Sequence, residues 1–447
     1  MQKNKLFSRG HLKLAVALFG ILGYSCSQAA NLFSHEQNLG RLLYKDKNLS
    51  LKKNQSCQSC HILNPITVWK QLPSGKFDKV RQPSASFADP DNIRNNTAVS
   101  DGSDTTKFGT LNTPSAGYAA FSPFFHWNAD EGLYIGGQFW NGRVNTLAEQ
   151  AAQPPLNPVE MAMPSKWAVV TRMKNNSRYV RMFKNIYKID LDQIPAYELA
   201  PAGEIPPPGV FAAYDAMAKA IGEFEKSRLF NRFDSKFDFV MAGKASFTEK
   251  ELSGFALFNG KGECSACHLT DMTTAPDGSP FPALLTDFTY DNLGVPRNET
   301  IPGNPEPNQG LGGRADIAAK DPSGSLIGAH KVMSLRNIAL TPPYMHNGAF
   351  TTLAEVVHFY NTRDTKPRVC KDITDPGFGK NCWPEPEFPD TMNTSELGDL
   401  GLTAREEADI VAFMETLTDN YQQWGNAADI PKNAPSPFAD VPLPPSP

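Results

Sequence analysis

The chain has 447 residues, of which 20% are charged and 40% hydrophobic, as in an ordinary globular protein. This length is enough for two or three domains. A formal net charge of −4 at pH 7 argues against nucleic acid as a partner, because proteins that bind nucleic acids carry a basic surface. The 37 prolines predict long irregular connections.

Residues 1–29 have the pattern of a secretory signal peptide. Four basic side chains accompany an apolar run from Leu14 to Leu22, and small residues at 27 and 29 suit cleavage after Ala29. The run is too short to cross a bilayer, and no later segment is apolar enough to be transmembrane. We expect an exported protein, periplasmic or associated with the cell surface. Cys26 leaves lipidation as an alternative.

Removal of residues 1–29, which carry four basic and no acidic side chains, would change the formal net charge from −4 to −8. Such an acidic protein is compatible with a cationic partner protein.

Two short motifs carry the chemistry of the sequence: Cys57-Gln58-Ser59-Cys60-His61 and Cys264-Ser265-Ala266-Cys267-His268. Both match C-x-x-C-H, in which two thiols attach a c-type heme and the His ligates its iron. The composition predicts roughly 0.002 chance occurrences of this pattern, so two are beyond accident. A zinc site would join two CxxC pairs and give the repeated His no role. We expect two covalently bound hemes c, with His61 and His268 as axial ligands.

Two further cysteines, Cys370 and Cys382, remain after the heme thiols and Cys26 are set aside. In an oxidising compartment such a pair predicts a disulfide that closes a short loop.

Apolar residues at helical spacing predict several helices. A helix over 36–55 leads into the first CxxCH and a similar one, Thr248–Gly260, leads into the second, as if one module were used twice. Residues 64–104 are rich in Pro, Ser, Asn and Asp, contain no His, and are expected to form a long loop. Further helices are expected at 166–186, 210–228, Thr352–Tyr360 and Thr403–Leu417.

Other motifs resemble the diheme bacterial cytochrome c peroxidase and MauG superfamily from about residue 36 to 420. The resemblance implies that the first heme reacts with hydrogen peroxide and that the second relays electrons. In chain order, the motifs are Asn112-Thr113-Pro114, Phe139 to Arg143, Gln150 to Met161, Asp287-Phe288, Asn292 to Pro296, Leu335-Arg336-Asn337 and Thr341 to Gly348.

This resemblance implies an all-α fold of two cytochrome-c-like heme domains with long irregular loops. The expected division is a signal peptide at 1–29, a peroxidatic heme domain at 30–233, an electron-transfer heme domain at 234–425 and a Pro-rich tail at 426–447.

The resemblance also implies a distal pocket above the first heme. Glu160 and Gln150 would lie in this pocket, and Pro154 would line it. Peroxide must lose a proton from one oxygen and gain one on the other before its O–O bond breaks. Glu160 is therefore the candidate general acid–base.

Two further sites are implied between the hemes. Trp140 matches a tryptophan that lies between the two irons and could pass an electron. Asn112, Thr341 and Pro343 match positions around a calcium ion, which prefers oxygen ligands such as carbonyls and amides.

The sixth ligand of the second heme separates two branches of the superfamily. Conventional peroxidases have Met there, whereas Tyr360 resembles the Tyr of MauG-like, MbnH-type members. A phenolate favours oxidised iron, in contrast with a thioether, which raises the heme potential. Met345 and Met333 stay alternative ligands. Conventional members also close the first heme with a His in the loop at 64–104, so the lack of His there predicts an open first heme.

The expected function is that of a MauG-like enzyme, in which hydrogen peroxide forms a high-valent diheme state that oxidises a side chain, expected to be Trp, of a partner protein. One alternative is a periplasmic cytochrome c peroxidase that takes electrons from a small c-type cytochrome. Another is a non-enzymatic electron carrier. The namesake of the branch has a surface Trp shortly before its second CxxCH, whereas residues 261–263 here are Lys-Gly-Glu, so the exit route remains open.

Overall fold

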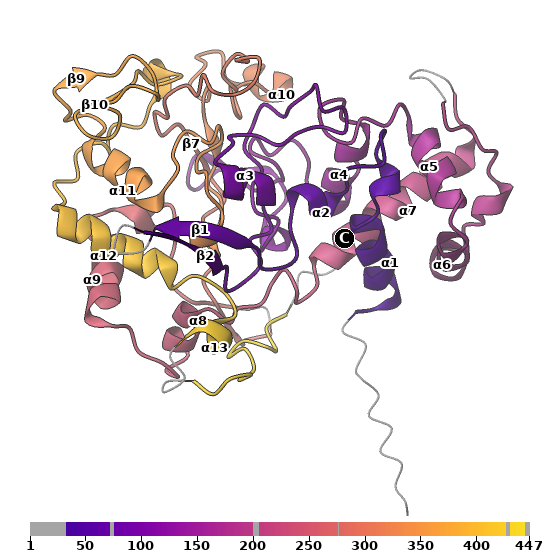
Figure 1. Ribbon diagram of the computed structural model, residues 1–447, viewed down its shortest axis with the longest axis horizontal. Coiled ribbons are helices and arrows are strands. Elements are labelled where there is room, and N and C mark those ends of the chain that lie inside the picture. The colour runs from indigo at the N-terminus through magenta and orange to yellow at the C-terminus, as the bar shows by residue number, and fades with distance from the viewer. Residues whose placement is uncertain (1–32, 72–75, 200–204, 276, 426–429, 443–447) are drawn as a thin grey trace, which may run out of the picture.

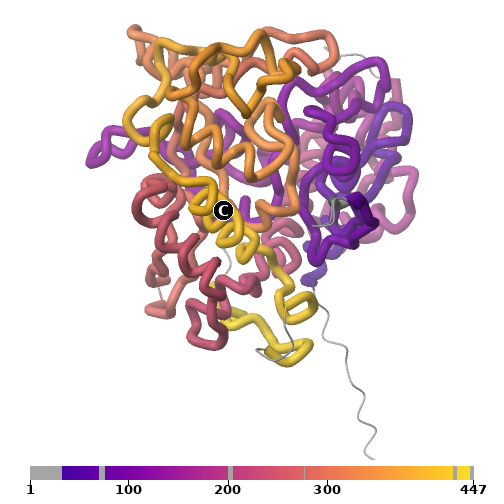
Figure 2. The backbone as a smooth tube through the Cα atoms, turned by 60° about the vertical axis from the view of Figure 1, so that its left-hand side comes forward, coloured from indigo at the N-terminus to yellow at the C-terminus, as the bar shows by residue number. Residues whose placement is uncertain are grey.

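The structure is a computed structural model that describes residues 33–442, except 72–75, 200–204, 276 and 426–429. The expected signal peptide lies outside these residues. Two groups of helices lie side by side, one formed by the first half of the chain and one by the second (Figures 1 and 2). Within the described ranges, no helix combines the length and the apolar character that a membrane span needs.

The first half is built around the long helix α7 (Pro208–Glu225). It packs against α1 (His35–Tyr44), α4 (Leu147–Ala151) and α5 (Lys166–Lys174). The remaining α-helices of this half are α2 (Cys57–Cys60), α3 (Pro90–Asn95) and α6 (Ser177–Tyr187).

The second half is built around α12 (Ala404–Glu415), which packs against α9 (Glu249–Phe258) and α11 (Leu353–Thr362). Thr403 and Glu406 form a capping box at the start of α12. The other α-helices are α8 (Lys236–Met241), α10 (Ala315–Ala318) and α13 (Tyr421–Trp424). Short 3-10 helices are η1 (Lys47–Leu49), η2 (Ala119–Phe121), η3 (Pro154–Leu156), η4 (Leu191–Gln193), η5 (Cys264–Ala266), η6 (Ile338–Leu340) and η7 (Pro389–Thr391).

The prediction of an all-α fold is wrong, because the described chain also forms five two-stranded sheets. Long connections must satisfy their own backbone hydrogen bonds, and local strand pairing does so. Only α7 among the described helices exceeds 12 residues. The sheets pair β1 (Thr67–Gln71) with β2 (Phe77–Arg81), β3 (His126–Asn128) with β4 (Leu133–Ile135), β5 (Thr273–Thr274) with β6 (Pro280–Phe281), β7 (Tyr290–Asp291) with β8 (His330–Lys331) and β9 (Arg368–Val369) with β10 (Cys382–Trp383).

Several expected elements differ in extent. The segment 64–104 contains the β1–β2 hairpin and α3 rather than a plain loop. The first helix ends at Tyr44 instead of continuing to 55. The expected helix at 166–186 is broken into α5 and α6 because Asn176 leaves helical geometry and caps α6 with its side chain.

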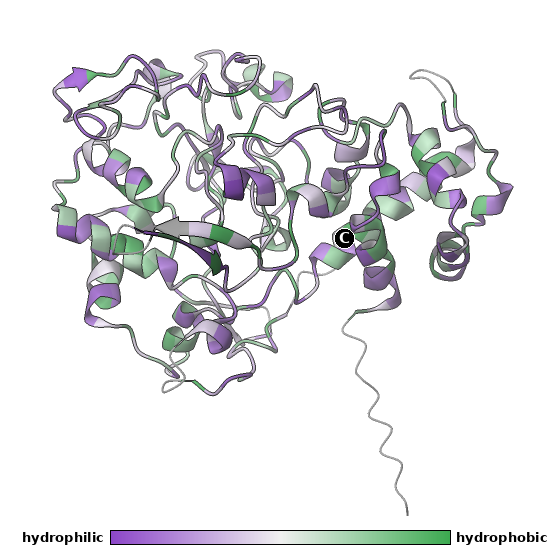
Figure 3. Ribbon diagram, in the orientation of Figure 1, coloured by the Kyte–Doolittle hydropathy of each residue, from purple (hydrophilic) through white to green (hydrophobic). Residues whose placement is uncertain are grey.

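Each half has its own hydrophobic core, and Figure 3 shows apolar residues on the helices of both groups. The N-terminal core extends in sequence from Leu39 to Phe230 and the C-terminal core from Phe237 to Leu417. This division supports our proposal of a domain boundary between 233 and 234.

A buried polar network joins the halves. Arg336 donates to both carboxylate oxygens of Asp238, at 2.8 and 2.9 Å, and both side chains are fully buried. The Arg336 guanidinium also lies 5.0 Å from the ring centre of Tyr118 and 4.7 Å from that of Phe233. The Tyr118 hydroxyl donates to Asp419 at 2.8 Å. Residues from four distant segments are therefore held together at this point.

The proline-rich segment after residue 425 also contacts this joint. Phe438 and Val441 are buried against Tyr118 and Phe233. These two residues therefore cover the place where the halves meet, while neighbouring described residues such as Lys432 and Asp440 are exposed.

The two modules share one feature of packing. A methyl group at Gly40 of α1 would overlap the carbonyl oxygen of Ala220 of α7, and one at Gly254 of α9 would overlap that of Asp409 of α12. In each half, the helix that precedes CxxCH therefore crosses its partner at a glycine.

We predict that Gly40→Ala and Gly254→Ala each lower the free energy of unfolding by about 1–3 kcal/mol, because backbone must move to admit the methyl group. Denaturant unfolding of the purified protein measures the change. Lys250→Ala, at an exposed position of α9, is the control and should change it little. Stability equal to that of the control would contradict the proposed close crossing.

Candidate functional site

Three adjoining cavities extend from the first half into the second. The first cavity contains the Cys57–His61 motif, and the second contains the Cys264–His268 motif. A central cavity shares residues with both of them. Among the described residues, Trp140 alone lines all three.

Both histidines of the CxxCH motifs are oriented by the backbone. Nδ1 of His61 lies 3.1 Å from the carbonyl oxygen of Phe87, and Nδ1 of His268 lies 2.8 Å from that of Leu285. A carbonyl partner fixes the proton on Nδ1 and leaves Nε2 as the metal ligand. Burial lowers the pKa of His61, and lowers that of His268 to about 4, so both imidazoles are neutral, as metal ligation requires.

The motif cysteines are not paired with one another as disulfides. Burial raises the pKa of the Cys57 and Cys264 thiols to about 12. Redox-active CxxC pairs instead have a lowered thiol pKa. The raised thiol pKa values thus disfavour a thiol–disulfide redox site at either motif.

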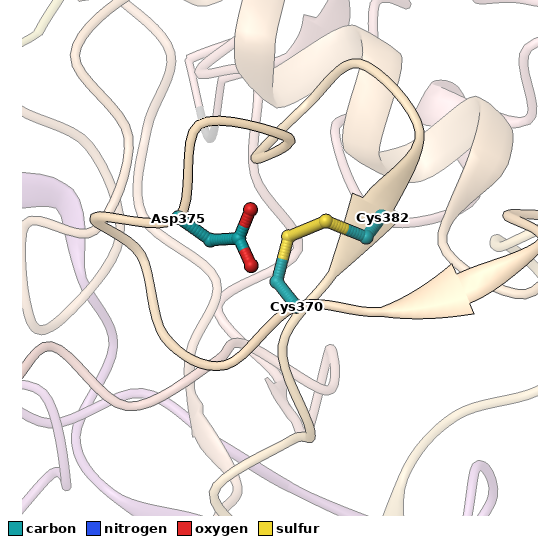
Figure 4. A group of neighbouring side chains, drawn as sticks. All are labelled: Cys370, Asp375 and Cys382. Atoms are coloured by element: carbon teal, nitrogen blue, oxygen red, sulfur yellow. A yellow bond between two sulfur atoms is a disulfide. The ribbon is translucent and has the colours of Figure 1, made fainter.

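Cys370 and Cys382 form a disulfide across a twelve-residue separation, and the Asp375 carboxylate lies beside it (Figure 4). These three side chains are of metal-binding types. Disulfide sulfurs are not thiolates, however, and Asp375 is already paired with Arg368 at 2.9 Å. The group is therefore a closed loop and not a metal centre.

The residues expected in the distal pocket all line the first cavity. They are Glu160, Gln150 and Pro154. The Asn157 amide donates to Oε1 of Glu160 at 2.7 Å. Burial raises the pKa of Glu160, while this hydrogen bond and the charge of Arg143 oppose the rise. A carboxyl group whose pKa is raised in a cavity is suited to move protons near neutral pH.

No histidine other than His61 is found among the described residues that line the first cavity. His126, a histidine outside the segment 64–104, lies on the exposed strand β3, and its Nδ1 is 2.8 Å from the carbonyl oxygen of Phe124.

Trp140 is held in place between the cavities by Asn112. Its indole Nε1–H donates to the carbonyl oxygen of Asn112 at 3.0 Å. The rings of His330 and His346 stack on each other at 3.7 Å, and both meet Trp140 edge to face. His346 also contacts Glu387 at 2.8 Å, which makes it a hydrogen-bonding residue.

The residues expected around calcium lie close to this tryptophan. The Asn112 amide donates to the carbonyl oxygen of Pro343 at 2.7 Å. The Thr341 hydroxyl donates to the carbonyl oxygen of Ile338 at 3.1 Å. The Asn112 amide also donates to the carbonyl oxygen of Met345 at 3.2 Å, so two backbone carbonyl oxygens face this side chain. A calcium ion would then find several oxygen ligands.

Tyr360 of α11 lines the second cavity. Burial is the main cause that raises the pKa of its phenol, and the Cys264 thiol adds to the rise. A positively charged metal ion beside the phenol would oppose this rise. Met333 and Met345, the alternative ligands, line the same cavity, so all three candidates lie together.

Two buried ionisable side chains, Glu225 and Lys331, were missed by the sequence analysis. Glu225 lines the first and central cavities, its Oε2 has no hydrogen-bond partner in the described protein, and burial raises its pKa to about 8. Lys331 lines the central and second cavities and donates to the carbonyl oxygen of Gly137 at 2.6 Å. Burial lowers the pKa of Lys331 to about 7. Each resembles an ordinary surface residue in sequence.

These features fit a c-type heme in each outer cavity. Each cavity offers two thiols for thioether bonds and one oriented imidazole for the iron. A heme also carries carboxylate groups, and the buried ammonium of Lys331 could form an ion pair with one of these carboxylates.

Comparisons with known proteins agree with this arrangement. Residues 34–246 match the family model described as di-haem cytochrome c peroxidase. The chain is 36% identical over 387 residues to the methylamine utilization protein MauG of Paracoccus denitrificans, covering 85% of this chain and 88% of that protein.

Two solved structures are similar in fold. The diheme peroxidase BthA of Burkholderia thailandensis has a TM-score of 0.63 and 26% identity, with 90% of this chain and 91% of that chain covered. A MauG-like protein associated with microbial copper homeostasis has a TM-score of 0.57 and 27% identity, with 87% and 90% covered. The chain therefore belongs to the di-haem cytochrome c peroxidase and MauG family, as an oxidoreductase that acts with hydrogen peroxide and carries two c-type hemes.

Proposed function

We propose that this protein is a MauG-like enzyme that uses hydrogen peroxide to oxidise a tryptophan side chain of a partner protein. The observation that carries the proposal is Tyr360 in the second cavity, since a phenolate ligand favours oxidised iron. A second heme with this ligand would be a poor acceptor from a high-potential cytochrome and well suited to storing an oxidising equivalent.

In this proposal, Cys57, Cys60 and His61 hold the first heme. The second heme is held by Cys264, Cys267, His268 and Tyr360. The hemes supply the redox chemistry by which peroxide is reduced.

The protein's own residues handle the protons and the electron path. Glu160 takes a proton from one peroxide oxygen and returns it to the other. Gln150 donates a hydrogen bond to the bound peroxide, and Pro154 limits the space beside it. Trp140, which lines all three cavities, carries electrons between the two heme sites.

A conventional cytochrome c peroxidase is the second candidate, with a small c-type cytochrome as the electron donor. Its support is that Met333 and Met345 also line the second cavity and could supply a thioether ligand. Membership of a peroxide-using family argues against the third possibility, a non-enzymatic electron carrier.

We also propose export to the periplasm or cell surface and a calcium ion at Asn112, Thr341 and Pro343. The basic and apolar pattern of residues 1–29 supports export. The Cys370–Cys382 disulfide agrees with an oxidising compartment. The nearby carbonyl and amide oxygens support calcium.

The first prediction from this proposal concerns Tyr360. Stoichiometric hydrogen peroxide, added to the purified diferric protein without reductant, should leave two oxidising equivalents on the hemes, one at each iron. Optical and Mössbauer spectra would detect them. Tyr360→Phe should lose the equivalent stored at the second iron. Tyr344→Phe is a matched control in the same cavity, because its hydroxyl donates only to the carbonyl oxygen of Ile338.

One result of this experiment would contradict the proposal. A diferric protein that stays inert toward peroxide until it is reduced by one electron would reject the MauG-like proposal in favour of a conventional peroxidase.

A second prediction concerns Glu160. Its ionised form accepts the proton, so the rate of reaction with peroxide should fall as the pH drops through its raised pKa. Glu160→Gln should slow the reaction about 10²–10⁴-fold and flatten this pH profile. Stopped-flow spectroscopy measures the rate. Glu299→Gln, at an exposed carboxylate that lines neither heme cavity, should keep the wild-type profile.

Calcium removal gives a third prediction. Ca²⁺ at about 100 times its Kd should stabilise the protein by about 2.7 kcal/mol relative to the chelated form. Thermal unfolding with EGTA, with Ca²⁺ and with Mg²⁺ measures the effect. Asn112→Ala should abolish the difference in Tm between the calcium-loaded and chelated protein, even if the substitution also changes the Tm of the chelated protein. An equal shift in the variant would place the ion elsewhere.

A further inference from the structure

The hairpin formed by β3 and β4 carries aromatic side chains from the protein surface toward Trp140. We propose that Trp127 at its surface end is the exit residue through which oxidising equivalents leave the protein and reach the partner. This inference rests on the proposed function and identifies the residue that delivers the oxidation.

The aromatic rings follow one another in contact. Trp127 meets Tyr134 edge to face, with ring centres 4.8 Å apart. Tyr134 stacks on Phe125 at 5.1 Å with the two planes only 6° apart, and Phe125 meets Tyr290 at 5.9 Å. Such contacts are ordinary packing distances for aromatic rings. An electron can therefore pass between the oxidisable rings Trp127, Tyr134 and Tyr290, with Phe125 filling the gap between the two tyrosines.

The inner end of the series reaches the segment that holds Trp140. Tyr290 on β7 pairs with Lys331 on β8, and the backbone N–H of Lys331 donates to the carbonyl oxygen of Trp140 at 2.8 Å. The Tyr290 hydroxyl lies against Gly142, two residues after Trp140, and donates to the carbonyl oxygen of Gly136. The series therefore ends beside the tryptophan that lines all three cavities.

The outer end is accessible to another protein. Trp127 is 52% exposed, and on its strand it stands opposite Tyr134, the next ring of the series. Tryptophan is enriched at the positions of protein interfaces where binding energy is concentrated. The hairpin turn adds the exposed acidic residues Asp130 and Glu131. This patch fits a partner that presents an oxidisable aromatic side chain within a basic surface.

The electrons balance over one turnover. Each transfer moves one electron from the partner's side chain to oxidised Trp127 and one from Trp127 inward through Tyr134 and Tyr290 to Trp140 and the hemes. Two transfers, with the two protons that the partner's side chain releases, complete the reduction of one hydrogen peroxide to two waters. Hydrogen peroxide is the only oxidant required.

Another exposed tryptophan provides the comparison. Trp69 on β1 is 63% exposed, yet the ring contact described for it is with the ammonium of Lys79, at 5.1 Å, and not with an aromatic residue. Trp69→Phe thus removes an accessible indole of the same kind without interrupting the aromatic series.

The experiment uses the holoprotein with both hemes and an excess of hydrogen peroxide, without a partner. Peptide mass spectrometry locates added oxygen atoms, and optical and Mössbauer spectra follow the stored oxidising equivalents. We expect oxygen addition at Trp127 before Trp69. We expect Trp127→Phe and Tyr134→Phe to prolong the oxidised state several-fold, and Trp69→Phe to leave its lifetime unchanged. Equal heme content and circular dichroism identify correctly folded variants.

Two results overturn the inference in distinguishable ways. If the oxidised state forms but Trp127 stays unmodified and Trp127→Phe decays at the wild-type rate, the exit lies elsewhere and the proposed function stands. If peroxide leaves no oxidising equivalents on the diferric protein, the proposed function fails and the inference fails with it.

Discussion

The buried ion pair between Arg336 and Asp238 of the second half lies where that half meets Tyr118 and Phe233 of the first. Both side chains are fully buried, so neither charge has water as an alternative partner. Loss of one partner from such a pair typically costs about 3–5 kcal/mol, because the other charge is left uncompensated. Arg336 lines the central cavity, and the segment just before it lines the second cavity too. The wall between the heme sites therefore depends on this pair.

The residues proposed for proton transfer and for electron transfer share the first cavity but are held by different groups. Glu160, the proposed proton carrier, lines the first cavity and is absent from the residues that line the other two. Trp140 is shared by all three cavities, and its indole is held by a backbone carbonyl rather than by a titrating group. A proton shift at Glu160 therefore does not alter the hydrogen bond that positions Trp140.

The heme attachment residues could be predicted because the spacing within CxxCH identifies both thiols and the histidine ligand without any information on the fold. Helices capped by Thr248 and Thr403 could also be predicted, since caps are local. The strands could not, because most have only two or three residues and too few positions to show an alternating pattern. Glu225 and Lys331 were missed for another reason: their burial comes from distant segments, which leave no local signal in the sequence.

Tyr360 differs from its neighbours in one respect that bears on how such proteins diversify. Three residues line the central as well as the second cavity: Met333, Met345 and Lys331. A substitution at any of them would change the lining of both cavities. Tyr360 comes from α11 and lines the second cavity alone. Under the proposed ligation of the second heme by Tyr360, its replacement would change the potential of that heme, and the first cavity, which Tyr360 does not line, would keep its shape. A single codon could therefore redirect the same scaffold between storing oxidising power and accepting electrons.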